Sequence, residues 1–162
     1  MTPRLTSRLT NLSTRTPRLQ SRATRAHARL YRRTGGRRGG RWINGAPVLV
    51  IETVGRRSGR PRATPVVYAR DGERFVVTAA NAGARRPPAW WLNLREAGTA
   101  TIQVGDRELR VRAEAAQGAE RERLWGVLRE VVPAIDDYVA FTDREFPIVV
   151  LEPAARTGDA GP

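Results

Sequence analysis

Short apolar segments separated by glycine-containing turns fill the chain from residue 46 onward and leave few folds open to it. The octapeptide Gly55-Arg56-Arg57-Ser58-Gly59-Arg60-Pro61-Arg62, the pair Asp71-Gly72 and the pair Gly105-Asp106 each separate two β-like runs. Turns of this composition between alternating apolar runs are typical of hairpins. The pattern predicts strands at 48–51, 64–70, 75–79, 99–104, 107–114 and 146–151. Pro65 places the second of these at a sheet edge or a bulge.

Helical periodicity lies between and before these strands. Pro87-Pro88 opens a helix predicted at 89–96, in which Trp90, Trp91 and Leu94 recur at helical spacing. Further helical segments are predicted at 22–33, 119–132 and, as a short turn, 137–141. Six short strands with interposed helices favour an α+β fold that is mainly antiparallel β, closed as a small barrel.

The chain divides into three parts by composition. Residues 1–21 are rich in Ser, Thr and Arg and poor in apolar side chains, so we expect a disordered basic segment. Residues 22–153 form the predicted domain, and 154–162 a flexible tail. No stretch approaches the roughly 20 apolar residues of a membrane span.

The net charge of +13 is concentrated at the start of the chain. Residues 1–41 contain twelve arginines and no acidic residue, so the other 121 residues carry only +1. The sequence has no lysine at all, which indicates a composition bias rather than selection for phosphate contacts. Only Tyr31 could stack on a base in this segment, and we therefore expect no specific nucleic-acid binding. A nucleic-acid module remains the second alternative for the function.

Cysteine and histidine usage limits the chemistry of the chain. There is no cysteine, which excludes disulfides and thiolate ligands, and the one histidine, His27, is expected to be a solvated side chain. We predict no metal site. Redox activity would therefore require a bound organic cofactor.

The arginine-rich octapeptide at 55–62, hereafter the arginine turn, predicts an anion site. Guanidinium groups stay charged and meet phosphate oxygens in a bidentate way, and turns expose backbone N–H groups. A basic surface hairpin explains the octapeptide alone equally well.

Three ordered blocks carry a resemblance to a known family. They are GRRSGRPRATPVVY, DGERFVVTAANAGARRPPAWWLNL and TDREFPIVVLEP. Together they resemble the deazaflavin-dependent nitroreductases over about residues 22–153. The resemblance implies a split β-barrel related to that of flavin-mononucleotide oxidoreductases. It also implies binding of coenzyme F-420, a deazaflavin with a phosphate-bearing, polyglutamylated tail.

The same resemblance implies which residues bind the cofactor. In the arginine turn and the strand after it, the anionic tail, phosphate and ring would be held by Arg56, Arg57, Ser58, Gly59, Arg62, Thr64 and Pro65. Backbone amides would approach the ring in the loop Ala80, Asn81, Ala82, Gly83 and Ala84, where small residues permit close contact. Ala80, Asn81 and Ala82 stand where some relatives have Ser, Lys and Gly. Trp90 would border the pocket, although core packing is the commoner role of such a tryptophan, and Trp91 is assigned to the core.

The substrate side of the predicted pocket retains one phenol. Tyr138 or water is predicted to donate the proton, and Tyr138, Phe141 and Ile135 are predicted to line the substrate pocket. Ile135 stands where the prodrug-reducing relatives have a tyrosine. We therefore expect hydride transfer from reduced coenzyme F-420 to a quinone, enone or nitro compound, with nitro-prodrugs disfavoured.

Two further expectations concern alternatives and location. A flavin- or haem-binding barrel, or a deazaflavin carrier without turnover, is the first alternative. The protein is expected in the cytoplasm as a monomer or homodimer. The helix at 22–33, with Ala23, Ala26, Leu30 and Tyr31 on one side, either contacts anionic lipid at the inner face of the membrane or caps the domain and shows its arginines to water.

Overall fold

The computed structural model describes residues 17–140 and 142–154. Most of the segment 1–21, the tail from residue 155 and Phe141 thus lie outside the described residues. The first described helix, α2 (Pro17–Thr34), starts before residue 22, so residues 17–21 belong to it.

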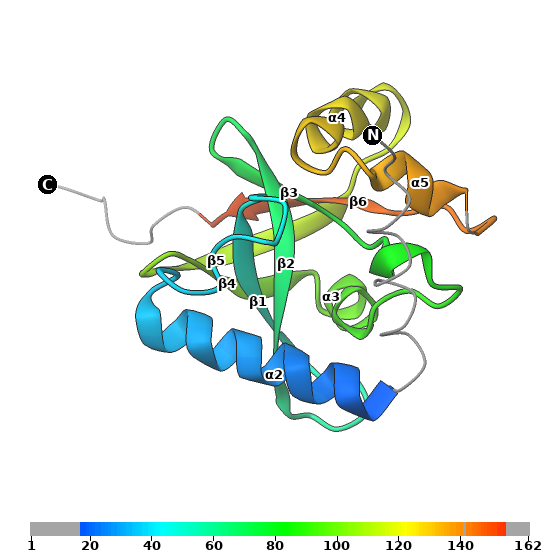
Figure 1. Cartoon of the computed structure of the whole chain (residues 1–162). Helices are drawn as coiled ribbons and strands as arrows, with labels where there is room; N and C mark the ends of the chain where they lie inside the picture. The colour runs from blue at the N-terminus through cyan, green and yellow to red at the C-terminus, as the bar shows by residue number, and fades with distance from the viewer. Residues whose placement is uncertain (1–16, 141, 155–162) are drawn as a thin grey trace, which may run out of the picture.

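Six strands form one closed antiparallel barrel, as the turn pattern predicts (Figure 1). Around the barrel they follow the order β1-β2-β3-β6-β5-β4. Their bounds are β1 (Val48–Val54), β2 (Pro61–Asp71), β3 (Arg74–Thr78), β4 (Thr99–Val104), β5 (Arg107–Ala115) and β6 (Ile148–Pro153).

The first strand closes the barrel because it pairs on both sides. Val50 lies opposite Pro65 of β2 and opposite Gln103 of β4. Pairing of β2 with β3 begins only at Tyr68. Pro65, which has no N–H to donate, therefore sits where β2 has a partner on one side only, as expected for a proline in a sheet.

The barrel interior is filled by apolar side chains and by one face of α3 (Ala89–Ala97). Trp90, Trp91 and Leu94 are buried in this cluster, which confirms the core assignment of Trp91. Gly98 ends α3 with φ 70° and donates its N–H to the Leu94 carbonyl at 2.7 Å. This left-handed cap turns the chain directly into β4.

A second cluster lies outside the sheet, under α4 (Gly118–Val131) and α5 (Ile135–Val139). Leu124 and Leu128 pack there against Val76 and Ile148. The last strand starts at Ile148, two residues later than predicted. Pro147 cannot donate a ladder hydrogen bond, and Phe146 is buried before the strand begins.

The N-terminal helix α2 lies across the barrel on the side away from α4 (Figure 1). Ala28 and Tyr31 pack on Val48 and Val50. The Tyr31 hydroxyl accepts a hydrogen bond of 2.8 Å from the Gly105 N–H. The expected apolar side is thus wrong in part, because Ala23, Ala26 and Leu30 are exposed and Ala28 takes their place.

The helix α2 caps the barrel. No helix in the described part of the chain combines the length and apolar character needed to cross a bilayer.

The expectation of a solvated His27 is wrong. Its Nε2 lies 2.7 Å from the Gly39 carbonyl oxygen, and its ring stacks on Trp42 with centroids 5.9 Å apart. His27 thereby connects α2 to the segment that leads into β1.

Candidate functional site

The arginine turn joins β1 to β2 and is held in shape by its own backbone. The Gly55 N–H donates to the Arg60 carbonyl at 2.9 Å, and the Gly59 N–H donates to the Gly55 carbonyl at 2.7 Å. Gly59 has φ 64°, a conformation that side chains disfavour, and a Cβ at Gly55 would lie 2.6 Å from Ser58 Oγ. Gly59 is therefore the conformationally demanding position of the turn, whereas a side chain at Gly55 would have to displace Ser58 Oγ.

A buried amide on α3 fixes this turn to the barrel. Asn93 is 5% exposed. Its Oδ1 accepts from the Arg56 N–H at 3.1 Å and from Arg56 Nη1 at 3.4 Å, and its Nδ2 donates to Thr53 Oγ1 at 3.2 Å. The side chain of Arg56 is thus oriented by a group from a different element.

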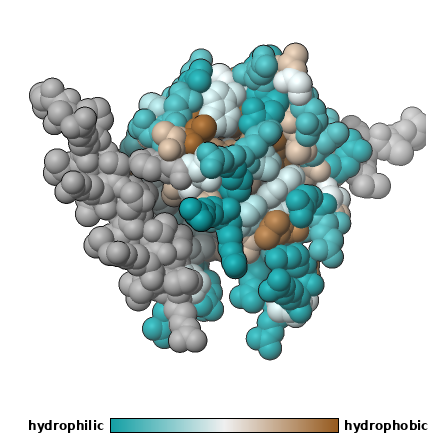
Figure 2. Space-filling view, turned by 90° about the vertical axis from the view of Figure 1, so that its right-hand side faces the viewer, coloured by the Kyte–Doolittle hydropathy of each residue, from teal (hydrophilic) through white to brown (hydrophobic). Residues whose placement is uncertain are grey.

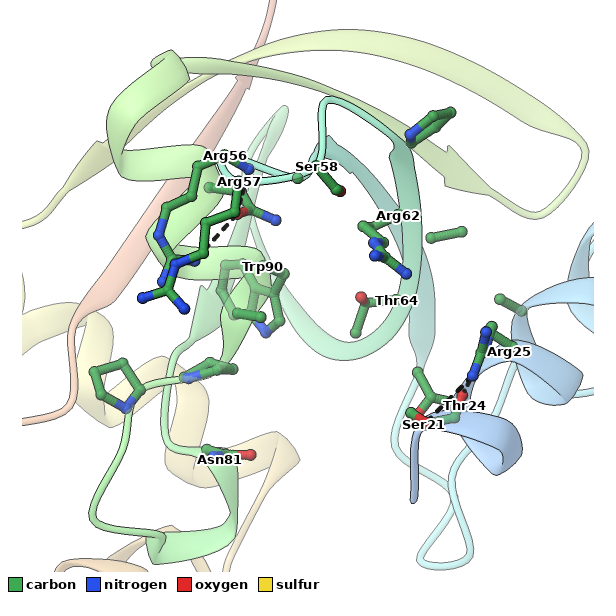
Figure 3. A pocket seen from close by; sticks show the side chains of 18 of the residues that line it. Ser21, Thr24, Arg25, Arg56, Arg57, Ser58, Arg62, Thr64, Asn81 and Trp90 are labelled. Carbon is green, nitrogen blue, oxygen red and sulfur yellow. Dashed lines mark hydrogen bonds between the residues drawn. The ribbon is translucent and has the colours of Figure 1, made fainter. Parts of the chain in front are cut away.

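A cavity of about 850 Å³ opens beside the turn. Its size is within the range of cofactor pockets. Figure 3 shows Arg56 and Arg57 on one side, Arg62 and Thr64 of β2 opposite them, and α2 as a further wall. The side chains and backbone that line it come from Ser21, Thr24, Arg25, Ala28, Arg29, Arg32, Gly55, Arg56, Arg57, Ser58, Pro61, Arg62, Ala63, Thr64, Asn81, Pro87, Pro88, Ala89, Trp90 and Asn93.

The cavity brings together most, but not all, of the residues that the sequence predicts for cofactor binding. Those that line it are Arg56, Arg57, Ser58, Arg62, Thr64, Asn81 and Trp90. Those that do not are Gly59, Pro65, Ala80, Gly83 and Ala84. Gly59 shapes the arginine turn and Pro65 continues β2, so both lie next to lining residues in the chain. Trp90 both lines the cavity and packs in the core.

The lining carries an excess of positive charge. Six arginines contribute to it and no Asp or Glu does, among the described residues. Arg32 forms an ion pair with Glu52, which lies outside the lining. The side of the molecule turned to the viewer in Figure 2, which carries the start of α2, is largely hydrophilic where it is coloured. Such a site attracts a ligand with several negative charges.

The loop predicted to face the cofactor ring has an unusual backbone that is held from outside. Asn81, Ala82 and Gly83 form the short helix η2 and have φ values of 50°, 51° and 79°. Arg144 donates to the carbonyls of Ala79, Ala80 and Ala84 at 2.8 to 3.3 Å. Burial lowers the pKa of Arg144 below its usual value. Left-handed residues persist where surrounding contacts enforce them, and Arg144 supplies those contacts here.

The predicted substrate residues lie on and around α5. Tyr138 is half-buried and does not line the cavity. Ile135 is fully buried in the cluster under α4, so it cannot form a wall of a substrate pocket in this structure. Phe141 lies outside the described residues. The helix α5 contacts η2, which places Tyr138 on the element next to the loop of Asn81.

Three contributions to the site escape prediction from the sequence. They are the arginines of α2, the amide of Asn93 and the guanidinium of Arg144. The polar Asn93 between apolar neighbours on a buried helix face was a usable signal. The other two depend on which segments meet across the barrel.

Comparison with known proteins gives a consistent assignment. Residues 23–153 match the family described as F-420H(2)-dependent quinone reductase. An F-420H(2)-dependent quinone reductase of Mycobacterium tuberculosis strain H37Rv is 35% identical over 130 residues, which are 78% of this chain and 87% of that protein.

Solved structures show the same fold. An F-420-H2-dependent reductase superposes with a TM-score of 0.61 at 29% identity, covering 65% of this chain and 94% of its own. A chain described as a domain-swapped dimer gives a TM-score of 0.63 at 26% identity, covering 85% of this chain and 100% of its own. A haem storage protein of Vibrio cholerae, at 17% identity and a TM-score of 0.52, shares the fold alone. This chain belongs to the F-420H(2)-dependent quinone reductase family of split β-barrels.

Proposed function

We propose that the protein is an oxidoreductase that binds reduced coenzyme F-420 in the cavity beside the arginine turn and transfers hydride to a quinone. Family membership carries the reaction type, and the relatives' names supply the quinone. The observation that carries the site is the set of arginines that lines the cavity without a carboxylate among the described residues. The flavin, haem and nucleic-acid alternatives are not favoured, because none accounts for the family match.

The donor set of the cavity fits an anionic cofactor. Arg56, Arg57 and Arg62 lie on two sides of the same space, so one ligand can contact all three (Figure 3). Guanidinium groups bind phosphate and carboxylate oxygens with strong, charge-assisted hydrogen bonds. Without a carboxylate in the lining, the ligand itself must supply the negative charge.

When bound, the reduced deazaflavin supplies the hydride, and the protein supplies position and environment. Arg56, Arg57 and Arg62 would hold the anionic end. Thr64 of β2 and the loop of Asn81 would flank the remainder of the cofactor, and Trp90 would exclude water from one side. Small residues in the 80–84 loop leave its backbone accessible to a flat ring.

The quinone gains two electrons with the hydride and needs one further proton. Tyr138 Oη is the group that we propose to donate it, because α5 contacts the loop of Asn81. Water is the alternative donor. A Tyr138→Phe variant distinguishes the two, since it lowers kcat without changing cofactor affinity only if the phenol donates.

Assembly and location are also proposals. Of monomer and homodimer, the structural neighbour described as a domain-swapped dimer favours the homodimer, which light scattering in solution tests. We propose a cytoplasmic protein whose contact with the membrane, if the α2 arginines make one, is electrostatic, because Ala28 and Tyr31 already pack on the barrel. Co-sedimentation with anionic liposomes, compared with the Arg22→Gln/Arg33→Gln variant, tests that contact, because these two exposed arginines can be neutralised while Ala28 and Tyr31 stay in place.

The cofactor site is tested by neutralising the arginine turn. Arg56→Gln and Arg57→Gln should each weaken binding of coenzyme F-420 by about 10-fold or more, as expected for the loss of a charge-assisted hydrogen bond. Quenching of the cofactor's fluorescence on titration measures the affinity. Arg60→Gln is the matched control, since Arg60 lies in the same turn but outside the cavity lining. Unchanged affinity in folded Arg56→Gln and Arg57→Gln proteins would contradict the proposed site.

A further inference from the structure

The wall of the cavity that α2 forms carries arginines of its own, in addition to those of the arginine turn. Its lining residues, here called the α2 wall, are Ser21, Thr24, Arg25, Ala28, Arg29 and Arg32. We propose that Arg25 and Arg29 bind the carboxylates of the cofactor's glutamate tail, and that they make affinity depend on tail length. This inference rests on the proposed function.

The spacing of the α2 wall places its arginines on one side of the helix. Arg25, Arg29 and Arg32 follow one another at intervals of four and three residues, which brings side chains to the same face. Ala28 and Tyr31, on the neighbouring face, are buried against the barrel and fix the rotation of the helix about its axis. The arginines are therefore held toward the cavity by the packing of α2, and Figure 3 shows Arg25 facing it across from the arginine turn.

The charges of the α2 wall differ in how far they are compensated. Arg32 is paired with Glu52. Arg25 donates to the Ser21 carbonyl at 3.0 Å and to Ser21 Oγ at 3.3 Å, which orients the guanidinium without neutralising it. Neither Arg25 nor Arg29 forms an ion pair with a carboxylate of the described chain.

The number of uncompensated cations identifies the class of ligand. Arg25, Arg29, Arg56, Arg57 and Arg62 all line one cavity without a carboxylate partner in the described residues. Like charges around one space repel, so an empty cavity is electrostatically unfavourable. A single phosphate group is too small and too weakly charged to satisfy both the turn and the α2 wall. A phosphate followed by a chain of carboxylates matches both in charge and in extent.

The test varies both the number of glutamates in the cofactor's tail and the charge of the α2 wall. Wild-type protein and the double variant Arg25→Gln/Arg29→Gln are titrated with two forms of the cofactor, one with several glutamates and one that keeps the phosphate but has no glutamate. Arg22→Gln/Arg33→Gln is the matched control, because it removes the same charge from exposed positions of α2 outside the lining. Fluorescence quenching gives the dissociation constant of each protein for each form, and circular dichroism checks the fold.

The wild type and the control variant should bind the glutamate-bearing form about fivefold or more tightly than the truncated form. In Arg25→Gln/Arg29→Gln this preference should fall to within about twofold, with affinity for the truncated form unchanged. Equal weakening of both forms, or of neither, would overturn the inference. Failure of the wild type to bind either form would instead refute the proposed function. If the double variant unfolds, the single variant Arg29→Gln replaces it with the same criteria.

Discussion

At the scale of single residues, the geometry of the arginine turn depends on the buried polar side chain of Asn93. Asn93 satisfies its amide with Thr53 of β1 and with Arg56 of the arginine turn. A buried amide pays for its desolvation only when it is hydrogen-bonded, so both partners matter. One side chain thus couples the stability of the core to the orientation of Arg56, which we propose binds the cofactor.

Replacing Asn93 should affect both properties. Asn93→Ala leaves Thr53 Oγ1 and the Arg56 N–H without their partner, and we expect a loss of about 1–3 kcal/mol in the free energy of unfolding. Cofactor affinity should fall severalfold because Arg56 loses its orientation. Urea unfolding and fluorescence titration measure the two effects. Thr53→Val is the control: it removes only the Thr53 bond and should lower stability while affinity stays at the wild-type value. Wild-type affinity in Asn93→Ala would show that the turn needs no anchor.

At the scale of elements, the side chain of Arg144 supplies hydrogen bonds to backbone carbonyls of the loop at 79–84. Three of its carbonyls accept from Arg144, and Phe146 lies 4.8 Å from the guanidinium carbon, as in a cation–π contact. The planar, forked group presents five N–H donors in fixed directions over a wide span, whereas an ammonium group has three donors on a single atom.

Arg144→Lys should therefore loosen this loop although it keeps the charge. We expect faster amide hydrogen exchange at 80–84 and about 1–3 kcal/mol lower stability, since buried carbonyls lose their donors. Hydrogen–deuterium exchange with mass spectrometry gives the local effect. Arg85→Lys, at an exposed neighbouring position, should leave exchange unchanged. Protection at 80–84 equal to that of the wild type would mean that the loop holds its conformation without Arg144.

A second connection between elements predicts how stability varies with pH. Asp71, at the end of β2, accepts two hydrogen bonds from Arg123 of α4, at 2.8 and 2.9 Å, and contacts Arg74 of β3. These hydrogen bonds, first from Arg123 and then from Arg74, hold the pKa of Asp71 well below its usual 3.8. Because the folded state lowers this pKa, the resulting stabilisation is present above pH 3.8 and is lost as the pH falls further.

Asp71→Asn should accordingly lower the Tm by a few degrees at pH 7. The difference from the wild type should shrink as the pH falls below about 3.8. Thermal unfolding followed by circular dichroism between pH 2.5 and pH 7, roughly the range in which carboxyl groups titrate, measures both values. Asp106→Asn, at an exposed position, should show no such dependence. A difference that stays constant with pH would exclude the ionised Asp71 as its source.

At the scale of the whole molecule, α2 is both a lid on the barrel and a wall of the cavity. Its packing depends on Ala28 and Tyr31, and the Tyr31 hydroxyl reaches the turn between β4 and β5 at Gly105. Strand β1 and the turn between β4 and β5 are thereby both tied to α2, which forms one wall of the cavity.

Tyr31→Phe removes one hydroxyl and leaves the half-buried Gly105 N–H without its acceptor. We expect about 1–2 kcal/mol lower stability, measured by urea unfolding. Weaker binding of the glutamate-bearing cofactor should accompany it, because the α2 wall is less firmly held. Tyr68→Phe is the control, since the Tyr68 ring packs edge-on against Phe75 and its hydroxyl has no hydrogen bond among the described residues. Unchanged stability in Tyr31→Phe would indicate that water replaces the hydroxyl.

Much of the fold was predictable because its signals are local. Asp71-Gly72 and Gly105-Asp106 specify turns, and alternation of apolar and polar residues around Leu109 and Val111 specifies a half-buried strand. The arginine turn was predictable for the same reason. The sequence places Ile135 in the substrate pocket and His27 in solvent, and the structure buries the first and packs the second against Trp42. A sequence shows the chemistry of a side chain but not which other elements pack over it.

The sequence by itself determined the six strands, the turns between them and the presence of an arginine-rich turn after the first strand, since these depend on neighbours within a few residues. Only the tertiary structure decided that α2, Asn93 and Arg144 complete the site. Closing the barrel brings segments that are 37 to 65 residues apart into hydrogen-bond contact. Such contacts follow from the pairing order of the strands, which no local pattern encodes.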